Sequence, residues 1–385
     1  MKPNRAPAAS RQNPHTQPLA LLGGLSPKQF LEEYWQRKPL LIRNAVPGFT
    51  GMLGRDEMFA AARRDDVESR LVCREGGDWD LRRGPFAAKD LKKRPYPWTV
   101  LVQGLNLILP EAEALMQQFN FIPHARLDDV MVSWATDGGG VGPHFDNYDV
   151  FLLQGIGQRH WRIGANKDQS LVEGLPIRIL KNFTPSKEWV LNPGDMLYLP
   201  PQYAHDGIAV GECMTYSVGF RTAPAQELAE GFLNFLQDKL CLKGRYADPG
   251  LKPAKHPGEI TSEMVDQVSG MLEKIQWDKG LVRDFLGEHL TEPKPHVFFD
   301  PPEKPLSEAK FVAAAVKKGL RLDARTQLLF AAKQFYLNGE TLEGVEAADR
   351  APLQALADNR HLDAVDARLA RQLYDWYCDG FLHLR

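Results

Sequence analysis

The chain has 385 residues, of which 43% are hydrophobic, and its 47 basic and 49 acidic side chains leave a net charge of −2. This length supports two or three domains, each with a core of its own. A near-neutral charge balance argues against a protein whose affinity depends on phosphate contacts, so direct nucleic-acid binding is not expected.

The cysteines and the N-terminus indicate the compartment. The four cysteines lie far apart in the sequence and form no C-x-x-C pair, which argues against a cysteine zinc site and against a disulfide framework. The first twenty residues are polar and proline-rich and lack the apolar core of a secretory signal. No stretch approaches the roughly 18 apolar residues of a membrane helix. These features predict a cytoplasmic protein without a membrane partner.

The N-terminal elements begin after a predicted flexible arm, residues 1–20. Ser26-Pro27-Lys28-Gln29 has the form of a capping box, with Ser26 as N-cap and Gln29 reaching back to it. The helix that it opens ends before Pro39, and Leu40-Leu41-Ile42 predicts a short buried strand.

From Val67 to Phe220 the sequence consists of short apolar runs separated by glycine and proline. Such a pattern is typical of an antiparallel sandwich or barrel. One helix, near Pro110 to Phe119, interrupts the strands. The expected strands are Ser69–Cys73, Trp98–Gln103, Val130–Trp134, Val150–Gln154, His160–Gly164, Asp195–Leu199 and Met214–Phe220.

After Arg221 the apolar residues recur at helical spacing, which predicts several amphipathic helices. Their apolar stripes fit an intramolecular helical layer and a dimer interface equally well. A proline-rich linker near 291–305 leads to a final segment with a hairpin signal, Asn338-Gly339, and a helix near Ala367 to Leu382. Residues 306–385 hold 11 basic and 11 acidic side chains, so this helix-plus-wing segment is predicted to have a structural or protein-docking role.

The central motif is Gly138-Gly139-Gly140-Val141-Gly142-Pro143-His144-Phe145-Asp146. Positions two apart on a strand point to one face, so His144 and Asp146 can bind one metal ion side by side. An H-x-D tripeptide alone is a weak signal, because a surface histidine beside a surface aspartate is its usual origin. The glycines give the backbone the freedom to bend before the pair.

A second element strengthens the motif. The run Asn192 to Pro200 contains a Pro-Gly-Asp turn and an apolar strand, and a following loop presents His205, 59 residues after Asp146. Two histidines and one carboxylate form the facial triad that suits iron(II) and leaves positions open for other ligands. Three protein ligands also suit a zinc hydrolase.

Arg159 bears on the choice between an iron oxygenase and a zinc hydrolase. The strands Asp149–Gln154 and His160–Gly164 are predicted to be antiparallel and joined through Gly155-Ile156-Gly157, which returns Arg159 toward the metal site. A cation that faces a barrel interior needs an anion, and a dicarboxylate cosubstrate would supply one. A surface arginine in a basic turn explains the residue equally well. His160 points to the opposite strand face and is excluded as a ligand.

Three segments, DGGGVGPHFDNYDVFLLQGIGQRHWRIG, NPGDMLYLPPQYAH and TYSVGFR, resemble the JmjC-type 2-oxoglutarate oxygenases. The bacterial ribosomal oxygenases, which hydroxylate an arginine of large-subunit ribosomal protein sixteen, are the members that the chain resembles along its whole length. The resemblance implies an α+β protein with a double-stranded β-helix barrel of the cupin type in 21–222. It implies a helical dimerisation domain in 223–290 and a winged-helix-like domain in 291–385.

The resemblance also implies roles for individual residues. His144, Asp146 and His205 would be both the catalytic residues and the ligands of Fe(II), and Arg159 would bind 2-oxoglutarate, with O2 as the second cosubstrate. Ser217 matches a polar position near the metal, Asp137 matches an acid that holds the substrate guanidinium, and Tyr148 could line the pocket. The serine that follows the last barrel strand in the family has no clear counterpart in Thr222–Gln226.

The predicted function is an Fe(II)- and 2-oxoglutarate-dependent protein hydroxylase that 3-hydroxylates an arginine of a ribosomal protein and forms a homodimer. Two alternatives stay open. One is the same chemistry on a histidyl or lysyl side chain, and the other is a metal-binding cupin without oxygenase activity. Succinate formation and a mass gain of one oxygen on candidate substrates separate the three.

Overall fold

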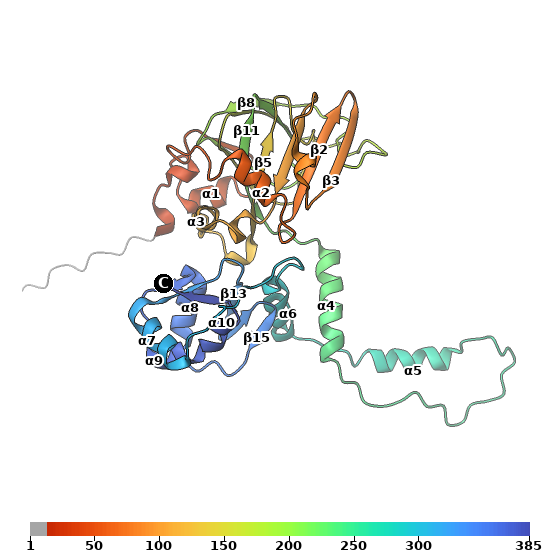
Figure 1. The fold of residues 1–385 in the computed structure, drawn as a ribbon. Helices are drawn as coiled ribbons and strands as arrows, with labels where there is room; N and C mark the ends of the chain where they lie inside the picture. The colour runs from red at the N-terminus through yellow and green to blue at the C-terminus, as the bar shows by residue number, and fades with distance from the viewer. Residues whose placement is uncertain (1–13) are drawn as a thin grey trace, which may run out of the picture. The chain divides into compact units, whose positions relative to one another are not determined.

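The computed structural model describes residues 14–385 (Figure 1). The chain divides into two compact units. The first contains the residues up to Thr222 together with Lys294–Asp300 and Asp323–Arg325, and the second contains the remainder. Most of the predicted N-terminal arm, 1–13, lies outside the described residues. In the described part of the chain, no helix combines the length and the apolar character needed to cross a bilayer.

The helices of the first unit are short. The predicted capping box at α1 is confirmed, because Gln29 N donates to Ser26 Oγ and Ser26 N donates to Gln29 Oε1. Pro110 stands in the first turn of α3, where its missing N–H costs nothing. The elements are α1 (Pro27–Glu33), α2 (Arg55–Ala61) and α3 (Pro110–Gln117), with 3-10 turns at Pro14–Thr16, Ala20–Leu22, Ala88–Leu91, Leu105–Leu107 and His124–Arg126.

Two antiparallel sheets form the body of the first unit, as the short apolar runs predict. The larger has the order β1-β9-β6-β11-β5-β4-β2-β3 and the smaller the order β10-β7-β8. The strands are β1 (Leu40–Ile42), β2 (Ser69–Glu75), β3 (Asp78–Arg83), β4 (Trp98–Val102), β5 (Leu127–Ala135), β6 (Val150–Gln154), β7 (Gln158–Gly164), β8 (Lys187–Leu191), β9 (Met196–Leu199), β10 (Ala204–Val210) and β11 (Cys213–Phe220).

One expectation about these strands is wrong. β6 and β7 are consecutive and joined by the turn 155–157, but they do not pair with each other. β6 lies between β9 and β11 in the larger sheet, whereas β7 lies between β8 and β10 in the smaller. The turn therefore carries the chain from one sheet to the other, as a barrel corner does.

Alternating side chains give the larger sheet two different faces. On β5, Val130, Val132 and Trp134 join the main core, which the helices α1, α2 and α3 cover. The opposite face shares a second, smaller core with the smaller sheet, since Leu152 of β6 packs in one cluster with Trp161 of β7. We call the space between the two sheets the barrel interior.

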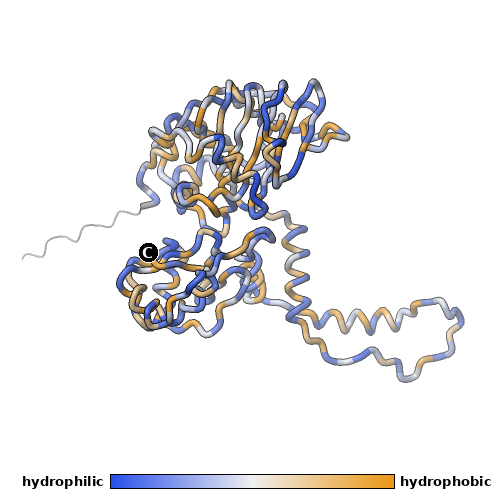
Figure 2. Tube along the Cα trace, in the orientation of Figure 1, coloured by the Kyte–Doolittle hydropathy of each residue, from blue (hydrophilic) through white to orange (hydrophobic). Residues whose placement is uncertain are grey.

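The second unit begins with three helices, α4 (Ala225–Lys239), α5 (Ser262–Leu272) and α6 (Lys279–Thr291). Phe232 and Phe235 of α4 pack on Phe285 of α6, with ring centroids 5.5 and 5.8 Å apart. No residue of α5 is buried. Figure 2 shows that hydrophobic residues nevertheless recur along this segment.

The C-terminal part of the second unit contains two three-stranded sheets, β16-β12-β17 and β13-β14-β15. The Asn338-Gly339 turn joins β14 to β15, with both residues at positive φ, as the sequence signal predicts. The predicted final helix is wrong in extent. It is broken at Leu373 and ends before a last strand. The elements are α7 (Glu308–Lys318), β12 (Leu320–Leu322), β13 (Leu328–Ala331), β14 (Gln334–Leu337), β15 (Glu340–Leu342), α8 (Arg350–Asn359), β16 (His361–Leu362), α9 (Ala367–Gln372), α10 (Tyr374–Cys378) and β17 (Leu382–Leu384).

Candidate metal centre

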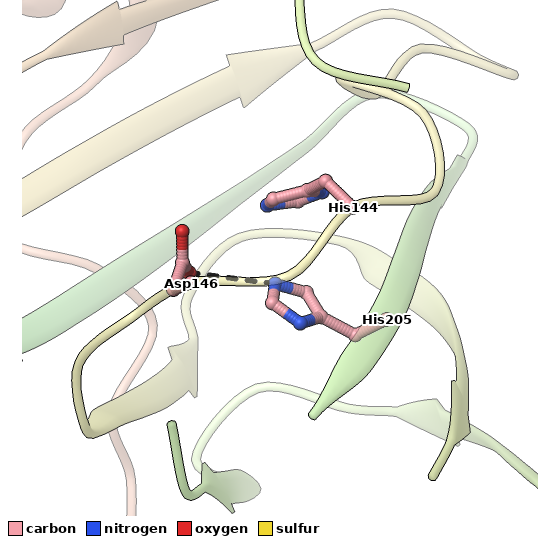
Figure 3. A group of neighbouring side chains, drawn as sticks. All are labelled: His144, Asp146 and His205. Carbon is pink, nitrogen blue, oxygen red and sulfur yellow. Dashed lines mark ion pairs between the residues drawn. The ribbon is translucent and has the colours of Figure 1, made fainter. Parts of the chain in front are cut away.

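Three predicted ligands, His144, Asp146 and His205, meet in the barrel interior. One ligand atom of each lies within 4.8 Å of those of the other two, and Figure 3 shows the side chains pointing toward one another. His144 and His205 form an isolated antiparallel bridge, in which His144 N donates to His205 O at 2.9 Å and His205 N donates to His144 O at 2.8 Å. The backbone itself therefore holds the two imidazoles together.

Two local details differ from the sequence prediction. His205 lies on β10, not on a loop after the strand, and only 3% of its side chain is exposed. Asp146 lies in the loop between the bridge and β6, so the pair His144 and Asp146 is not carried by a regular strand. The loop still brings the carboxylate back, since Asp146 Oδ2 is 3.6 Å from His205 Nε2.

The backbone sets the tautomer of both histidines. His144 Nδ1 is 2.9 Å from Gly142 O, and His205 Nδ1 is 2.9 Å from Tyr203 O. A carbonyl oxygen only accepts hydrogen bonds, so each Nδ1 carries the proton and each Nε2 keeps a free lone pair. Holding the far nitrogen of a ligand histidine in this way is the usual support of a metal site.

The electrostatics agree with metal binding. Burial, followed by the neighbouring His144, lowers the pKa of His205 to about 4, so this imidazole is neutral near pH 7. A metal ion needs the neutral form. Two imidazole Nε2 atoms and one carboxylate, with no fourth protein ligand in the cluster found among the described residues, fit an iron(II) facial triad that keeps positions open for small ligands.

Arg159 lies in the barrel interior, where only 4% of it is exposed. Arg159 pairs with Ala209 of β10. Ala209 is four positions after His205 on that strand, so Arg159 and His205 lie on the same face of the smaller sheet. Its Nη2 is 3.6 Å from Cys213 Sγ, and its Nε is buried without an acceptor. Among residues 14–385, no carboxylate lies within ion-pair distance of Arg159. A buried guanidinium without a counter-charge is costly, which indicates a site for an anionic ligand.

The residue after Arg159 behaves as predicted. His160 points to the outer face of β7 and meets Glu188 Oε2 at 3.1 Å. It takes no part in the metal cluster found among the described residues.

The remaining predicted site residues lie in different surroundings. Ser217 of β11 is buried on the interior face, opposite Leu152 and Met131. Tyr148 is 41% exposed at the residue level, yet its hydroxyl lies against Asp146. Burial of that hydroxyl and the charge of Asp146 raise the pKa of Tyr148.

Asp137 is exposed and lies in the turn before the glycine run. Its Oδ1 accepts a hydrogen bond from Gly211 N at 2.8 Å, which fixes the turn between β10 and β11. This contact is the ordinary use of an Asp-Gly turn residue, and it leaves the second carboxylate oxygen available.

Asp129, a buried carboxylate in the barrel interior, is not among the site residues predicted from the sequence. It shares its strand face with Met131, and its Oδ1 lies 3.6 Å from the point where a Cβ on Gly219 would be. Gly104 N donates to Oδ2 at 2.9 Å, and the structure gives Oδ1 no hydrogen-bond donor from the described residues. Burial, followed by the adjacent Asp128, raises the pKa of Asp129 to about 6. The available signal was an acid at an inward position of an apolar strand.

Comparisons with known proteins agree with this geometry. Residues 114–228 match the JmjC domain family, and residues 274–383 match the ROXA-like winged helix family. The chain is 33% identical over 341 residues to the ribosomal protein uL16 3-hydroxylase of Escherichia coli K12, covering 87% of this chain and 89% of the relative. It is also 33% identical over 364 residues to a probable ribosomal oxygenase of Haemophilus influenzae, covering 88% and 87%.

Solved structures show the same relationship. The structure of YcfD from Escherichia coli has a TM-score of 0.81 and 30% identity, covering 94% of this chain and 98% of that one. A second structure of that ribosomal oxygenase, in complex with cobalt and 2-oxoglutarate, has a TM-score of 0.78 with the same coverage. The predicted barrel and winged-helix-like domain are therefore confirmed, and the chain belongs to the JmjC-domain ribosomal oxygenases.

Proposed function

We propose that this protein is an Fe(II)- and 2-oxoglutarate-dependent hydroxylase that 3-hydroxylates an arginine of ribosomal protein uL16. The observation that carries the proposal is the pairing, in one barrel, of the His144-Asp146-His205 cluster with the buried Arg159 that lacks a carboxylate partner among the described residues. A zinc hydrolase would use the first feature but has no need for the second. The Escherichia coli relative is named a ribosomal protein uL16 3-hydroxylase.

Each residue has a defined task in this proposal. His144, Asp146 and His205 would hold the iron through two Nε2 atoms and one carboxylate oxygen. When bound, the iron supplies the activation of O2 that is coupled to the oxidative decarboxylation of 2-oxoglutarate. Arg159 pairs with the distal carboxylate of the cosubstrate and so orients it. The barrel excludes water, and Ser217 offers a hydroxyl on the interior wall.

The substrate guanidinium has two candidate partners. Asp137 follows from the family resemblance and lies on the surface in the β10–β11 turn. Asp129 is buried, close enough to Tyr148 for its charge to act on that hydroxyl, and it has one carboxylate oxygen without a donor. A desolvated carboxylate binds a guanidinium more strongly than an exposed one, so we assign the guanidinium to Asp129 and a secondary role at the entrance to Asp137.

The two assignments are separated by matched variants. Asp129→Asn is expected to raise the KM for uL16 by at least about tenfold, because a buried hydrogen bond to a charged group contributes roughly 1.5–3 kcal/mol. Asp137→Asn is expected to change this KM only severalfold. Steady-state assays at saturating 2-oxoglutarate measure the KM for uL16 in both variants. A larger rise in KM for Asp137→Asn than for Asp129→Asn would assign the substrate guanidinium to Asp137.

The raised pKa of Asp129 makes substrate binding depend on pH. Its folded-state pKa of about 6 is above the ordinary value of 3.8, so Asp129 is neutral below about pH 6 and charged above it. The KM for uL16 is expected to fall as the pH rises from 5 to 7.5. His205, with a pKa of about 4, is neutral over this range and adds no such dependence. A pH profile of KM tests this, and Asp129→Asn is expected to flatten it.

We also propose that the protein acts in the cytoplasm as a homodimer formed through α4 and α5. The four cysteines lie far apart in the sequence, a pattern that suits a reducing compartment. On α5, Val265 is 51% exposed and Leu272 is 56% exposed, Met264 and Val268 are exposed as well, and Met271 is half-buried. An uncovered apolar stripe of this kind is stabilised by burial against a second copy.

The dimer is tested on α5 itself. Val268→Arg places a charge within the apolar stripe and is expected to shift the protein to a monomer in sedimentation at micromolar concentration. Asp266→Arg places the same side chain on the polar face of α5 and is expected to leave the dimer intact. A Val268→Arg protein that sediments as the unmodified protein does would show that the stripe is not the interface.

The enzymatic proposal is tested by succinate release. With iron, ascorbate and 2-oxoglutarate present, release is expected to rise when full-length uL16 is added. It is expected to stay at the basal rate with uL16 in which the target arginine is replaced by lysine. Release that is indifferent to every protein substrate would instead favour a cupin without protein hydroxylase activity.

A further inference from the structure

Gln154, the last residue of β6, is a fully buried polar side chain outside the metal centre. Its Nε2 is 3.1 Å from Ile156 O, 3.3 Å from Gly157 O and 3.0 Å from Met214 O. Thr215 Oγ1 donates to its Oε1 at 2.9 Å. An amide has two N–H donors, so one of them is shared between two carbonyls. This one side chain bridges the turn 155–157 and strand β11, which backbone hydrogen bonds also join, from Gly155 N to Met214 O at 2.9 Å and from Met214 N to Ile156 O at 2.8 Å.

The turn 155–157, which the Gln154 side chain contacts, is tightly packed. A Cβ on Gly155 would lie 2.7 Å from the ring of Tyr216, and a Cβ on Gly157 would lie 2.2 Å from Glu212 O. Gly157 also has a φ of +69°, which favours glycine. The turn is therefore packed directly on β11 and the residues before it, and a change in the turn shifts the start of β7.

Arg159 lies two residues after this turn. Its guanidinium contacts Cys213 Sγ, and Cys213 Cβ is 2.9 Å from the position of a Cβ on Gly157. The turn, Cys213 and Arg159 thus form one contiguous packing unit. Gln154 is joined to the same unit through Met214 O and Thr215 Oγ1, which follow Cys213 on β11.

We propose that Gln154, with its amide oriented by Thr215, is a positioning residue that fixes the 155–157 turn and thereby sets the Arg159 guanidinium for the distal carboxylate of 2-oxoglutarate. This inference rests on the proposed function of Arg159. Gln154 does not touch the reacting atoms. It acts through the turn, so its loss weakens cosubstrate binding and leaves the metal site unchanged.

Two pairs of variants test this role in the full-length protein. Gln154→Glu keeps the shape but turns the donor into an acceptor facing three carbonyls, and Gln158→Glu makes the same change on the exposed side of the turn. Thr215→Val removes the hydroxyl that orients the amide, and Thr215→Ser keeps it. The measurements are KM for 2-oxoglutarate, kcat at saturating cosubstrate, Co(II) affinity and the thermal midpoint.

Gln154→Glu and Thr215→Val are expected to raise the KM for 2-oxoglutarate by about tenfold or more, because small misplacements of a binding group are costly. In both, kcat at saturation and Co(II) affinity are expected to stay within about twofold of the unmodified protein. Gln158→Glu and Thr215→Ser are expected to behave as the unmodified protein. If Gln154→Glu does not fold, the comparison of Thr215→Val with Thr215→Ser tests the positioning role instead.

A lowered thermal midpoint with an unchanged KM would overturn the proposal, because Gln154 would then support the fold alone. An equal rise in KM for Gln158→Glu would also overturn it, because the effect would not belong to the buried amide. Failure of the underlying function has a different signature. In that case Arg159→Ala leaves the KM for 2-oxoglutarate unchanged, or the unmodified protein consumes none.

Discussion

Asp146→Ala is expected to abolish turnover and to weaken metal binding by more than about 100-fold, since losing even a supporting contact of a metal ligand costs 10–100-fold. Asp146 is the only carboxylate of the cluster, and its side chain is 23% exposed, so its removal leaves no large cavity. The fold is therefore expected to survive. Co(II) titration, succinate release and a thermal melt measure the three quantities on the same sample.

The control for this variant is Asp168→Ala, which removes an exposed aspartate from a loop of the same unit. It is expected to keep full activity. The prediction fails if Asp146→Ala still turns over at more than about a tenth of the unmodified rate, since a facial triad does not tolerate the loss of its carboxylate.

Arg159→Ala is expected to raise the KM for 2-oxoglutarate by about 30-fold or more, because truncating one partner of a buried charge pair costs about 2–5 kcal/mol. The metal site is expected to keep its Co(II) affinity, since Arg159 of β7 lies opposite Ala209, four positions along β10 from His205, and its side-chain hydrogen bond goes to Cys213 and not to a metal ligand. The measurement is the KM for 2-oxoglutarate at fixed iron and uL16 concentrations.

A matched control is available on β3. Arg82 is an exposed arginine that pairs with Asp90, and Arg82→Ala is expected to leave the KM unchanged because exposed ion pairs contribute little. Unaltered cosubstrate dependence in Arg159→Ala would remove Arg159 from the site and would leave the barrel without an explanation for its buried cation.

Local sequence signals predicted the parts of the fold that depend on neighbouring residues. The capping box of Ser26 and Gln29 and the Asn338-Gly339 turn form because their hydrogen bonds and backbone angles are set within four residues. The partners of a strand are not encoded so locally. The turn 155–157 looks like a hairpin turn, yet β6 and β7 enter different sheets.

The sequence also predicted only part of the candidate site: the three metal ligands, but not Asp129. The spacing from His144 to His205 and the family motifs identified the three ligands, because the chemistry demands those residue types. Asp129 was missed because an Asp-Asp pair before an apolar run looks like a solvated strand end. Its inward direction follows only from the pairing of β5 with β11, which places Met131 opposite Ser217. The buried tautomer contacts at Gly142 O and Tyr203 O also need the folded backbone.

The most direct measurement of the central claim is mass mapping of uL16 after incubation with the iron-loaded protein, 2-oxoglutarate and O2. We predict a gain of one oxygen on a single arginine, absent when 2-oxoglutarate is omitted and absent with Asp146→Ala. An unmodified uL16, recovered under conditions where the protein binds both the metal and the cosubstrate, would contradict the account.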